Sequence, residues 1–395
     1  MIIASVLLAV VLLGGSVVVF WPGDDDNGNA GGDVAPATTA STEPPSVSEL
    51  DETVAEISEF VAEERGLDFR EPVNVELEED AAFEARLFED FEEDAADLEL
   101  DEPLFKALGL VEPDGDLAGD LREAYSGGVV GFYDSETEEL VVRGAALTPF
   151  VRVTIAHELV HALDDQHFEL HRPQYDDADD EIGFGFTALA EGVATEVEEA
   201  YLGDLPEAER EQYFDELNDM AGGVIPDVSL TLLELITAPY QVGPDFVDAL
   251  QDDGGQRRLD EAYDAPPTTS EQVLDPEAYF DGEAGVDVPH PTPDGQLVEE
   301  GVLGQLFVQL LLTDHIPTAD ARAAAEGWGG DWAVSWSDGA RSCVRFTIVG
   351  DTAIETEELV TGWANWADAV DGRGLTVTID EPAAIQPLTV TSCTE

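Results

Sequence analysis

Two histidines and a glutamate lie close together in the stretch His157-Glu158-Leu159-Val160-His161. Residues i and i+4 of a helix share one face, so both imidazoles could bind a single metal ion. Glu158 lies beside that face, where a carboxylate could take a proton from a metal-activated water without being a ligand. The alternative is an ordinary amphipathic helix with two hydrogen-bonded histidines. The chain contains only six His, which favours the metal site over a chance match.

The flanking residues predict the helix that this pattern needs. Thr148 is a suitable N-cap, and Pro149 suits the first helical position. Apolar residues recur through 150–163 and give the helix a broad surface to bury. We expect the helix to end near Gln166 or His167.

A catalytic zinc site needs a third protein ligand, and the sequence offers two. His167 follows His161 by six residues. Glu191 stands among Ala, Leu, Gly and Val in the segment 188–195, an unusual setting for a carboxylate in contact only with solvent.

Each alternative resembles a known class of zinc peptidase. The spacing of His167 resembles that of the third His of metzincins, although metzincins have Gly where this chain has Asp164 and no clear Met-turn surrounds Met220. The segment around Glu191 resembles the E-G-x-A element of gluzincins, above all of their aminopeptidase branch. That resemblance implies that Glu191 is the third ligand.

A second element of the aminopeptidase branch occurs downstream. Tyr240-Gln241-Val242-Gly243 resembles its Y-x-x-G element, in which the Tyr hydroxyl donates to the oxyanion of the tetrahedral intermediate. The resemblance implies this catalytic role for Tyr240, and a core Tyr is the alternative. The expected site therefore consists of catalytic Glu158 and Tyr240 around a Zn²⁺ ion held by His157, His161 and Glu191.

Most of the chain from about 125 to 335 resembles a wider group of bacterial and archaeal zincin-like proteins. The resemblance implies a metallopeptidase fold but no particular substrate. In that group a His precedes the second Pro position of the stretch at 266–279; in this chain Asp275 precedes Pro276. The stretches are AHELVHALDDQHF (156–168), EGVAT (191–195), PYQVGPDFV (239–247), PPTTSEQVLDPEAY (266–279) and GWGGD (327–331).

The charge balance is extreme, with 89 Asp and Glu against 15 Lys and Arg and a formal net charge of −74. Lys106 is the only lysine. Such a chain repels nucleic acid and acidic membrane surfaces, so we expect no nucleic-acid partner. Because salt screens repulsion between like charges, the composition indicates a protein of a haloarchaeon or another organism that lives at high salt.

The first 48 residues differ from the rest. Residues 1–22 contain an uninterrupted apolar run of membrane-spanning length and predict a transmembrane anchor with the bulk of the chain outside the cell. A cleaved signal peptide, which would make the protein secreted, is the alternative. Residues 23–48 are rich in Gly, Ala, Thr, Ser and Pro and predict a disordered stalk.

The remaining pattern predicts an α+β fold that is zincin-like, mainly helical and provided with a small mixed sheet. We expect a metallopeptidase domain over 49–335 and a C-terminal α+β region over 336–395. A hairpin is predicted over 129–143, separate helical segments over 227–237 and 243–250, and an apolar helix over 298–312.

The only two cysteines, Cys343 and Cys393, could form a disulfide or remain buried thiols. One of Asp164 and Asp165, a turn after His161, could orient the free ring nitrogen of that His.

The sequence thus predicts a zinc-dependent peptidase on the outside of a halophilic cell, acting on a peptide or protein. The strand near 128–133 could bind an extended peptide by strand addition. The rival hypothesis is a membrane-anchored surface binding protein that keeps a zincin fold without turnover.

Overall fold

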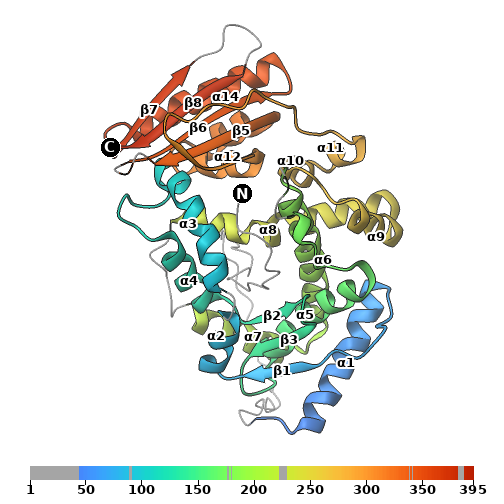
Figure 1. The fold of residues 1–395 in the computed structure, drawn as a ribbon. Coiled ribbons are helices and arrows are strands. Elements are labelled where there is room, and N and C mark those ends of the chain that lie inside the picture. Colours follow the sequence, from blue (N-terminus) through green and yellow to red (C-terminus); the bar gives the residue numbers. More distant parts are fainter. Residues whose placement is uncertain are drawn as a thin grey trace, which may run out of the picture.

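The computed structural model shows a mixed α+β protein, mainly helical with two small sheets (Figure 1), which confirms the predicted class at this level. The five-stranded sheet with helix α14 lies at one end of the molecule, and α1 with the three-stranded sheet lies at the other (Figure 1). The structure describes residues 44–88, 91–175, 178, 180–221, 229–337, 339, 341–380 and 387–395.

Helices make up most of the described chain. They are α1 (Val47–Arg65), α2 (Asp80–Leu87), α3 (Phe91–Ala107), α4 (Leu117–Gly128), α5 (Pro149–Phe168), α6 (Ile182–Asp204), α7 (Glu207–Ala221), α8 (Leu230–Gly254), α9 (Gln256–Asp264), α10 (Ser270–Leu274), α11 (Pro276–Asp281), α12 (Gly304–Thr313), α13 (Thr318–Ala325), α14 (Ala353–Val370) and a short 3-10 turn, Pro173–Tyr175.

The strands form two separate sheets. The smaller sheet has the order β1-β3-β2, and the larger has the order β4-β5-β6-β8-β7. Their bounds are β1 (Val75–Glu78), β2 (Gly131–Asp134), β3 (Glu139–Arg143), β4 (Gln296–Gly301), β5 (Trp328–Ser337), β6 (Ser342–Gly350), β7 (Leu375–Asp380) and β8 (Leu388–Thr394).

The predicted hairpin is confirmed as the antiparallel pair β2–β3. Asp134 closes its turn, because its side chain accepts hydrogen bonds from the backbone N–H groups of Glu136 and Thr137. β1 adds to the other side of β3 in parallel, so β2 forms an edge of this mixed sheet.

Helix α5 runs through one hydrophobic core together with α1, α6, α8 and the small sheet. Ile155, Leu159 and Leu163 of α5 are fully buried in that core. Because these apolar residues recur at helical spacing, the helix buries them and carries the residues between them into the interior.

The larger sheet is covered on both faces. Val344, Phe346 and Ile348 of β6 point to a second core that includes side chains of α3, α12 and α14. The opposite face packs against the segment 286–294, where the Thr347 hydroxyl donates to the carbonyl of Pro289. The central strands β5 and β6 are therefore buried on both faces, whereas the edge strands β4 and β7 are partly exposed.

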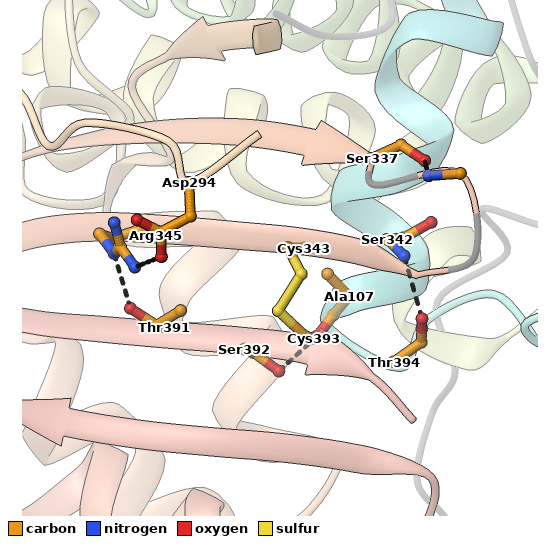
Figure 2. Close-up of a disulfide and its surroundings, with 11 residues drawn as sticks. Ala107, Asp294, Ser337, Ser342, Cys343, Arg345, Thr391, Ser392, Cys393 and Thr394 are labelled. Atoms are coloured by element: carbon orange, nitrogen blue, oxygen red, sulfur yellow. Dashed lines mark hydrogen bonds and ion pairs between the residues drawn. A yellow bond between two sulfur atoms is a disulfide. The ribbon is translucent and has the colours of Figure 1, made fainter. Parts of the chain in front are cut away.

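Cys343 and Cys393 form a disulfide between directly opposed residues of β6 and β8 (Figure 2). Next to it, Ser392 Oγ donates to the carbonyl of Ala107 at 2.6 Å and ties β8 to the end of α3. Of the two alternatives left open by the sequence, a disulfide or two buried thiols, the structure shows the disulfide.

Two expected elements differ from the structure. From Leu230 on, the segments predicted separately over 227–237 and 243–250 belong to the single helix α8, which continues through Pro239 and Pro244. Packing of α8 against α6 outweighs the backbone hydrogen bonds that the two prolines remove. The helix predicted over 298–312 is instead strand β4 followed by α12, because β4 pairs with β5.

The domain boundary expected at 335/336 falls inside β5, whose neighbours β4 and β6 belong to one sheet. The predicted anchor over 1–22 and most of the stalk over 23–48 lie outside the described residues, and α1 begins at Val47. In the part of the chain that the structure describes, no helix has both the length and the apolar character to cross a membrane.

Candidate metal centre

The helix that carries the H-E-x-x-H pattern begins as expected. The Thr148 side chain accepts from the N–H of Val151, Pro149 occupies the first turn, and the helix ends at Phe168. Except for Arg152, every residue from Pro149 to Asp164 is buried, so α5 brings His157, Glu158 and His161 into the interior. Their side chains are at most 1% exposed.

Helix α6 packs beside α5 and adds Glu191, which is 0% exposed. The three potential ligands form a nearly equilateral triangle. His157 Nε2 lies 3.2 Å from both His161 Nε2 and Glu191 Oε2, and His161 Nε2 lies 3.3 Å from Glu191 Oε2. Among the described residues this is the one group of His, Cys, Asp or Glu arranged to hold a metal ion.

These distances fit a small ion with tetrahedral coordination. With ligand bonds of about 2.0–2.1 Å, neighbouring ligand atoms of a tetrahedral zinc site lie about 3.3 Å apart. The second oxygen of Glu191, Oε1, is buried and has no hydrogen-bond partner among the described residues. A buried carboxylate oxygen with no donor is costly unless a cation meets it, so the residues present fit a metal ion.

Helices α6 and α8 approach each other closely, which explains the glycine in both the E-G-x-A and the Y-x-x-G elements. A Cβ atom on Gly192 of α6 would lie 2.5 Å from the backbone carbonyl of Gly243 of α8. One on Gly243 would lie 2.2 Å from the carbonyl oxygen of Ala188. Only glycine permits this contact, which holds Glu191 and the start of the Y-x-x-G element on the same side of the site.

Tyr240 lies one turn before Gly243 on α8, and its ring stacks on that of His157 with centroids 6.2 Å apart. The structure therefore brings all five residues expected from the sequence to one place. His167, the alternative ligand, lies elsewhere: its Nε2 donates to the carbonyl of Asp68 at 2.9 Å.

Glu198 is a site residue that sequence reasoning missed. Its Oε2 lies 2.9 Å from His157 Nδ1, and its Oε1 accepts from the Tyr213 hydroxyl at 3.5 Å. Glu198 follows Glu191 by seven residues, or two helical turns, so both project from one face of α6. That spacing was the signal available in the sequence.

The expected role of Asp164 and Asp165 is wrong. Asp164 accepts from Arg65 Nε at 2.8 Å and from the Tyr263 hydroxyl, so it ties α5 to α1 and α9. Asp165 accepts from the Tyr133 hydroxyl at 2.8 Å. Neither has a hydrogen bond with His161 in the part of the chain that is described, because Arg65 and two tyrosine hydroxyls engage the carboxylates.

Glu158 lies beside the three ligands with both carboxylate oxygens buried, and among the described residues no side chain donates a hydrogen bond to them; the backbone N–H of Tyr133 is the donor that approaches them. Burial raises the pKa of Glu158 well above its usual value, His157 opposes that rise, and the charge of Glu191 adds to it. Gly131 of β2 lies against it, since a Cβ atom there would be 2.9 Å from Glu158 Oε1.

Electrostatic coupling within the triangle is strong. Burial alone would lower the pKa of His157, but hydrogen bonds and charge from Glu191 and Glu198 raise it well above the usual value. Burial opposes ionisation of Glu191, yet the charge of His161 and hydrogen bonds from both imidazoles lower its pKa to about 2. Glu191 is therefore an anion, as a metal ligand must be.

Comparison of the chain with family models, with curated proteins and with solved structures gives no match.

Proposed function

We propose that this protein is a zinc-dependent peptidase of the gluzincin type with a zincin-like fold. One observation carries the proposal: the buried triangle of His157, His161 and Glu191 has directly beside it the buried carboxylate of Glu158, to which no side chain of the described residues donates a hydrogen bond. Two imidazoles and one carboxylate are the ligand set of one class of catalytic zinc site. A zinc ion bound there would activate water and polarise the carbonyl to be cleaved.

The surrounding side chains supply the proton transfers. Glu158 takes a proton from the attacking water and passes it to the leaving amine. Its raised pKa suits this task, because a base holding a proton more tightly than an exposed carboxylate can accept and return it near neutral pH. Tyr240 donates to the developing oxyanion from the opposite helix.

Strand β2 is the proposed binding site for an extended peptide. It forms an edge of its sheet among the described residues, and Gly131 lies against Glu158. A peptide added to this edge would make backbone hydrogen bonds and lie beside the catalytic carboxylate.

We further propose that the protein acts outside a halophilic cell. The disulfide between Cys343 and Cys393 supports an oxidising compartment, and the net charge of −74 supports a high-salt environment. An anchor within residues 1–22 would retain it at the membrane, and a cleaved signal peptide would release it.

A digest of a peptide library in molar KCl tests the activity. We expect cleavage that a chelator abolishes and added Zn²⁺ restores. A protein that binds zinc with the same stoichiometry but cleaves no peptide would instead support the second hypothesis, a surface binding protein without turnover.

A further inference from the structure

A pocket of about 820 Å³ lies beside the small sheet, on the face that turns away from α5. Its walls come from α2, from α4, from Arg143 at the end of β3 and from Met220 near the end of α7. The face follows from the alternation of side chains along β3. Val142 packs in the core with α5, whereas Val141 packs with Phe83 of α2, and Arg143 shares the face of Val141. The metal centre described above uses none of the wall residues.

Two arginines line the pocket, although the whole chain has only 15 basic residues against 89 acidic ones. The guanidinium carbon of Arg143 lies 4.7 Å from the ring centroid of Phe83, and that of Arg122 lies 4.1 Å from the ring centroid of Phe88. An aromatic ring under a guanidinium holds it in place and leaves its charge for an anion in the guanidinium plane. A chain so poor in cations thus places two of them at one pocket.

Arg143 is the residue that points to a ligand. Its Nε and Nη2 are buried and have no hydrogen-bond partner among the described residues. A guanidinium always carries its charge, so buried N–H groups without an acceptor are unfavourable. Glu78, the neighbour of Arg143 across the strand pair β1–β3, pairs instead with Arg86 at 3.4 Å. An anion that enters the pocket would supply the missing acceptor.

The acidic side chains of the pocket restrict the ligand. Glu84 of α2 and Glu123 of α4 also line it, and Glu84 Oε1 accepts from the Ser126 hydroxyl at 2.7 Å. Their charges repel an anion in proportion to its own charge, so a phosphate dianion is opposed about twice as strongly as a carboxylate. A carboxylate also matches the planar guanidinium, from which it can accept two parallel hydrogen bonds. The ligand expected here is therefore a single carboxylate.

The pocket lies close to the strand at which a peptide is proposed to bind. The N–H of Arg143 donates to the carbonyl of Val130 at 2.8 Å, and Met220 packs against the cluster that contains Val130. Val130 precedes Gly131, the residue that lies against the catalytic carboxylate. Gly127 of the pocket wall precedes Gly131 by four residues, so this wall is at most about 14 Å from Gly131. An extended peptide on β2 would cover that distance in about four residues.

We propose that this pocket is a substrate subsite in which Arg143, assisted by Arg122, binds a carboxylate of the peptide. The inference rests on the proposed function and names its substrate class, which is peptides with a carboxylate a few residues from the bond that is cleaved. An acidic side chain and the C-terminus present the same group. Salt screens repulsion from the distant acidic surface but screens a partly buried pair at contact distance much less, so such a peptide can bind in molar KCl.

Peptide binding to Glu158→Gln in molar KCl with Zn²⁺ tests the subsite without turnover. Fluorescence anisotropy compares labelled short peptide libraries that have Glu or Gln at one internal position, each with a free or an amidated C-terminus. We expect a carboxylate form to bind at least about 10-fold more tightly than its neutral counterpart, the effect of a charged hydrogen-bonded pair. The Glu/Gln comparison reports a side-chain carboxylate, and the acid/amide comparison reports the C-terminus.

Arg143→Gln in the same background should remove most of this preference. Arg143→Lys, which keeps the charge but not the planar fork, should keep part of it. Arg122→Gln provides a second test if Arg143→Gln does not fold. The matched control is Arg257→Gln, which removes an arginine on α9 that is 69% exposed and paired with Glu261, and it should keep the full preference.

Cleavage of the same libraries by the unaltered protein separates the subsite from the activity. There the preference should appear as a lower KM for the carboxylate form. Absence of cleavage together with an Arg143-dependent binding preference would refute the proposed peptidase and support the subsite as a peptide-binding site. Two results would overturn the subsite: equal binding of the carboxylate and neutral forms in both comparisons, or a preference that survives in both Arg143→Gln and Arg122→Gln.

Discussion

His157 is held from two sides by carboxylates of one helix. Glu191 lies at its Nε2 and Glu198 at its Nδ1. If the Nδ1 proton is donated to Glu198, the lone pair of Nε2 is free for a metal, so Glu198 selects the tautomer and the ring orientation that a ligand needs. Two carboxylates that lie two turns apart on α6 therefore have different roles toward the same imidazole: Glu198 orients it, and Glu191 binds the metal beside it.

Metal content separates Glu191 from the rival ligand His167. Glu191→Ala should purify with little zinc and lose peptidase activity, because one of three protein ligands is gone. His167→Ala should keep most of its zinc when dialysed at matched free metal, because its Nε2 is bonded to the carbonyl of Asp68. Loss of zinc from His167→Ala with retention in Glu191→Ala would contradict the assignment, and the role of Tyr240 would fall with it.

The residues of α5 could be predicted because their pattern is local. His157, Glu158 and His161 are related by helical spacing alone. Glu198 and the partners of Asp164 depend on how α6, α1 and α9 pack against α5, and a single sequence does not show that packing. Glu191 and Tyr240 were found through resemblance to a family.

At the level of elements, the crossing of α6 and α8 sets the geometry of the site. The two backbones touch at Gly192 and Gly243. Because α8 is one helix through both of its prolines, Tyr240 has a fixed place relative to Gly243. The sequence pattern suggested a break there, since proline normally ends a helix and the compensating contact with α6 is distant in sequence.

Gly243→Ala should force α6 and α8 apart, because the added methyl group would lie 2.2 Å from the carbonyl oxygen of Ala188. We expect a loss of about 1–3 kcal/mol of stability, typical of overpacking, together with weaker zinc binding as Glu191 moves. Urea unfolding and zinc titration measure the two effects.

Gly203→Ala is the matched control on α6, where an added Cβ atom would meet no atom of the described residues within 4 Å. Alanine there should be neutral or slightly stabilising. Equal behaviour of the two variants would show that the close approach does not position the ligand.

The start of helix α12 explains why the prediction of one helix over 298–312 was wrong. Gly304 adopts a left-handed conformation with φ of 83°, and the Asp331 carboxylate accepts from the N–H groups of Leu303 and Gly304. These contacts start a helix in the middle of the run. Asp331 comes from a strand that was not predicted, so its effect could not be anticipated.

At the scale of the whole molecule, a buried acidic side chain lies where helix α6 meets helices α10 and α12. Glu181, before α6, accepts from the N–H and the hydroxyl of Ser270 and lies against Gly304 at the start of α12. Burial, with the charges of Asp331 and Asp180 added, raises the pKa of Glu181 from 4.5 to about 8. The carboxyl group of Glu181 therefore keeps its proton at neutral pH.

Stability should fall as pH rises from about 5 to 8. In this range the unfolded chain has released the Glu181 proton, whereas the folded chain still binds it, so each increase in pH favours unfolding. Glu181→Gln should flatten this dependence of the melting temperature, and Glu358→Gln, at an exposed position of α14, should not. An identical slope for Glu181→Gln and the unaltered protein would contradict the assignment.

The net charge of −74 predicts a strong dependence on salt. At low ionic strength, repulsion acts over distances of about a nanometre or more and opposes the compact state. Melting temperature should rise steeply between dilute buffer and molar KCl, measured by circular dichroism. A melting temperature that does not change would show that the acidic surface is not an adaptation to salt.

The central claim is that the triangle is a catalytic zinc centre in which Glu158 moves the proton. The most direct measurement pairs zinc stoichiometry with peptide cleavage for the unaltered protein and for Glu158→Gln, in molar KCl. We predict equal zinc in both proteins and a rate reduced about 10²–10⁴-fold in the variant, the usual contribution of a general base. Equal cleavage rates, or no zinc in either protein, would contradict the account.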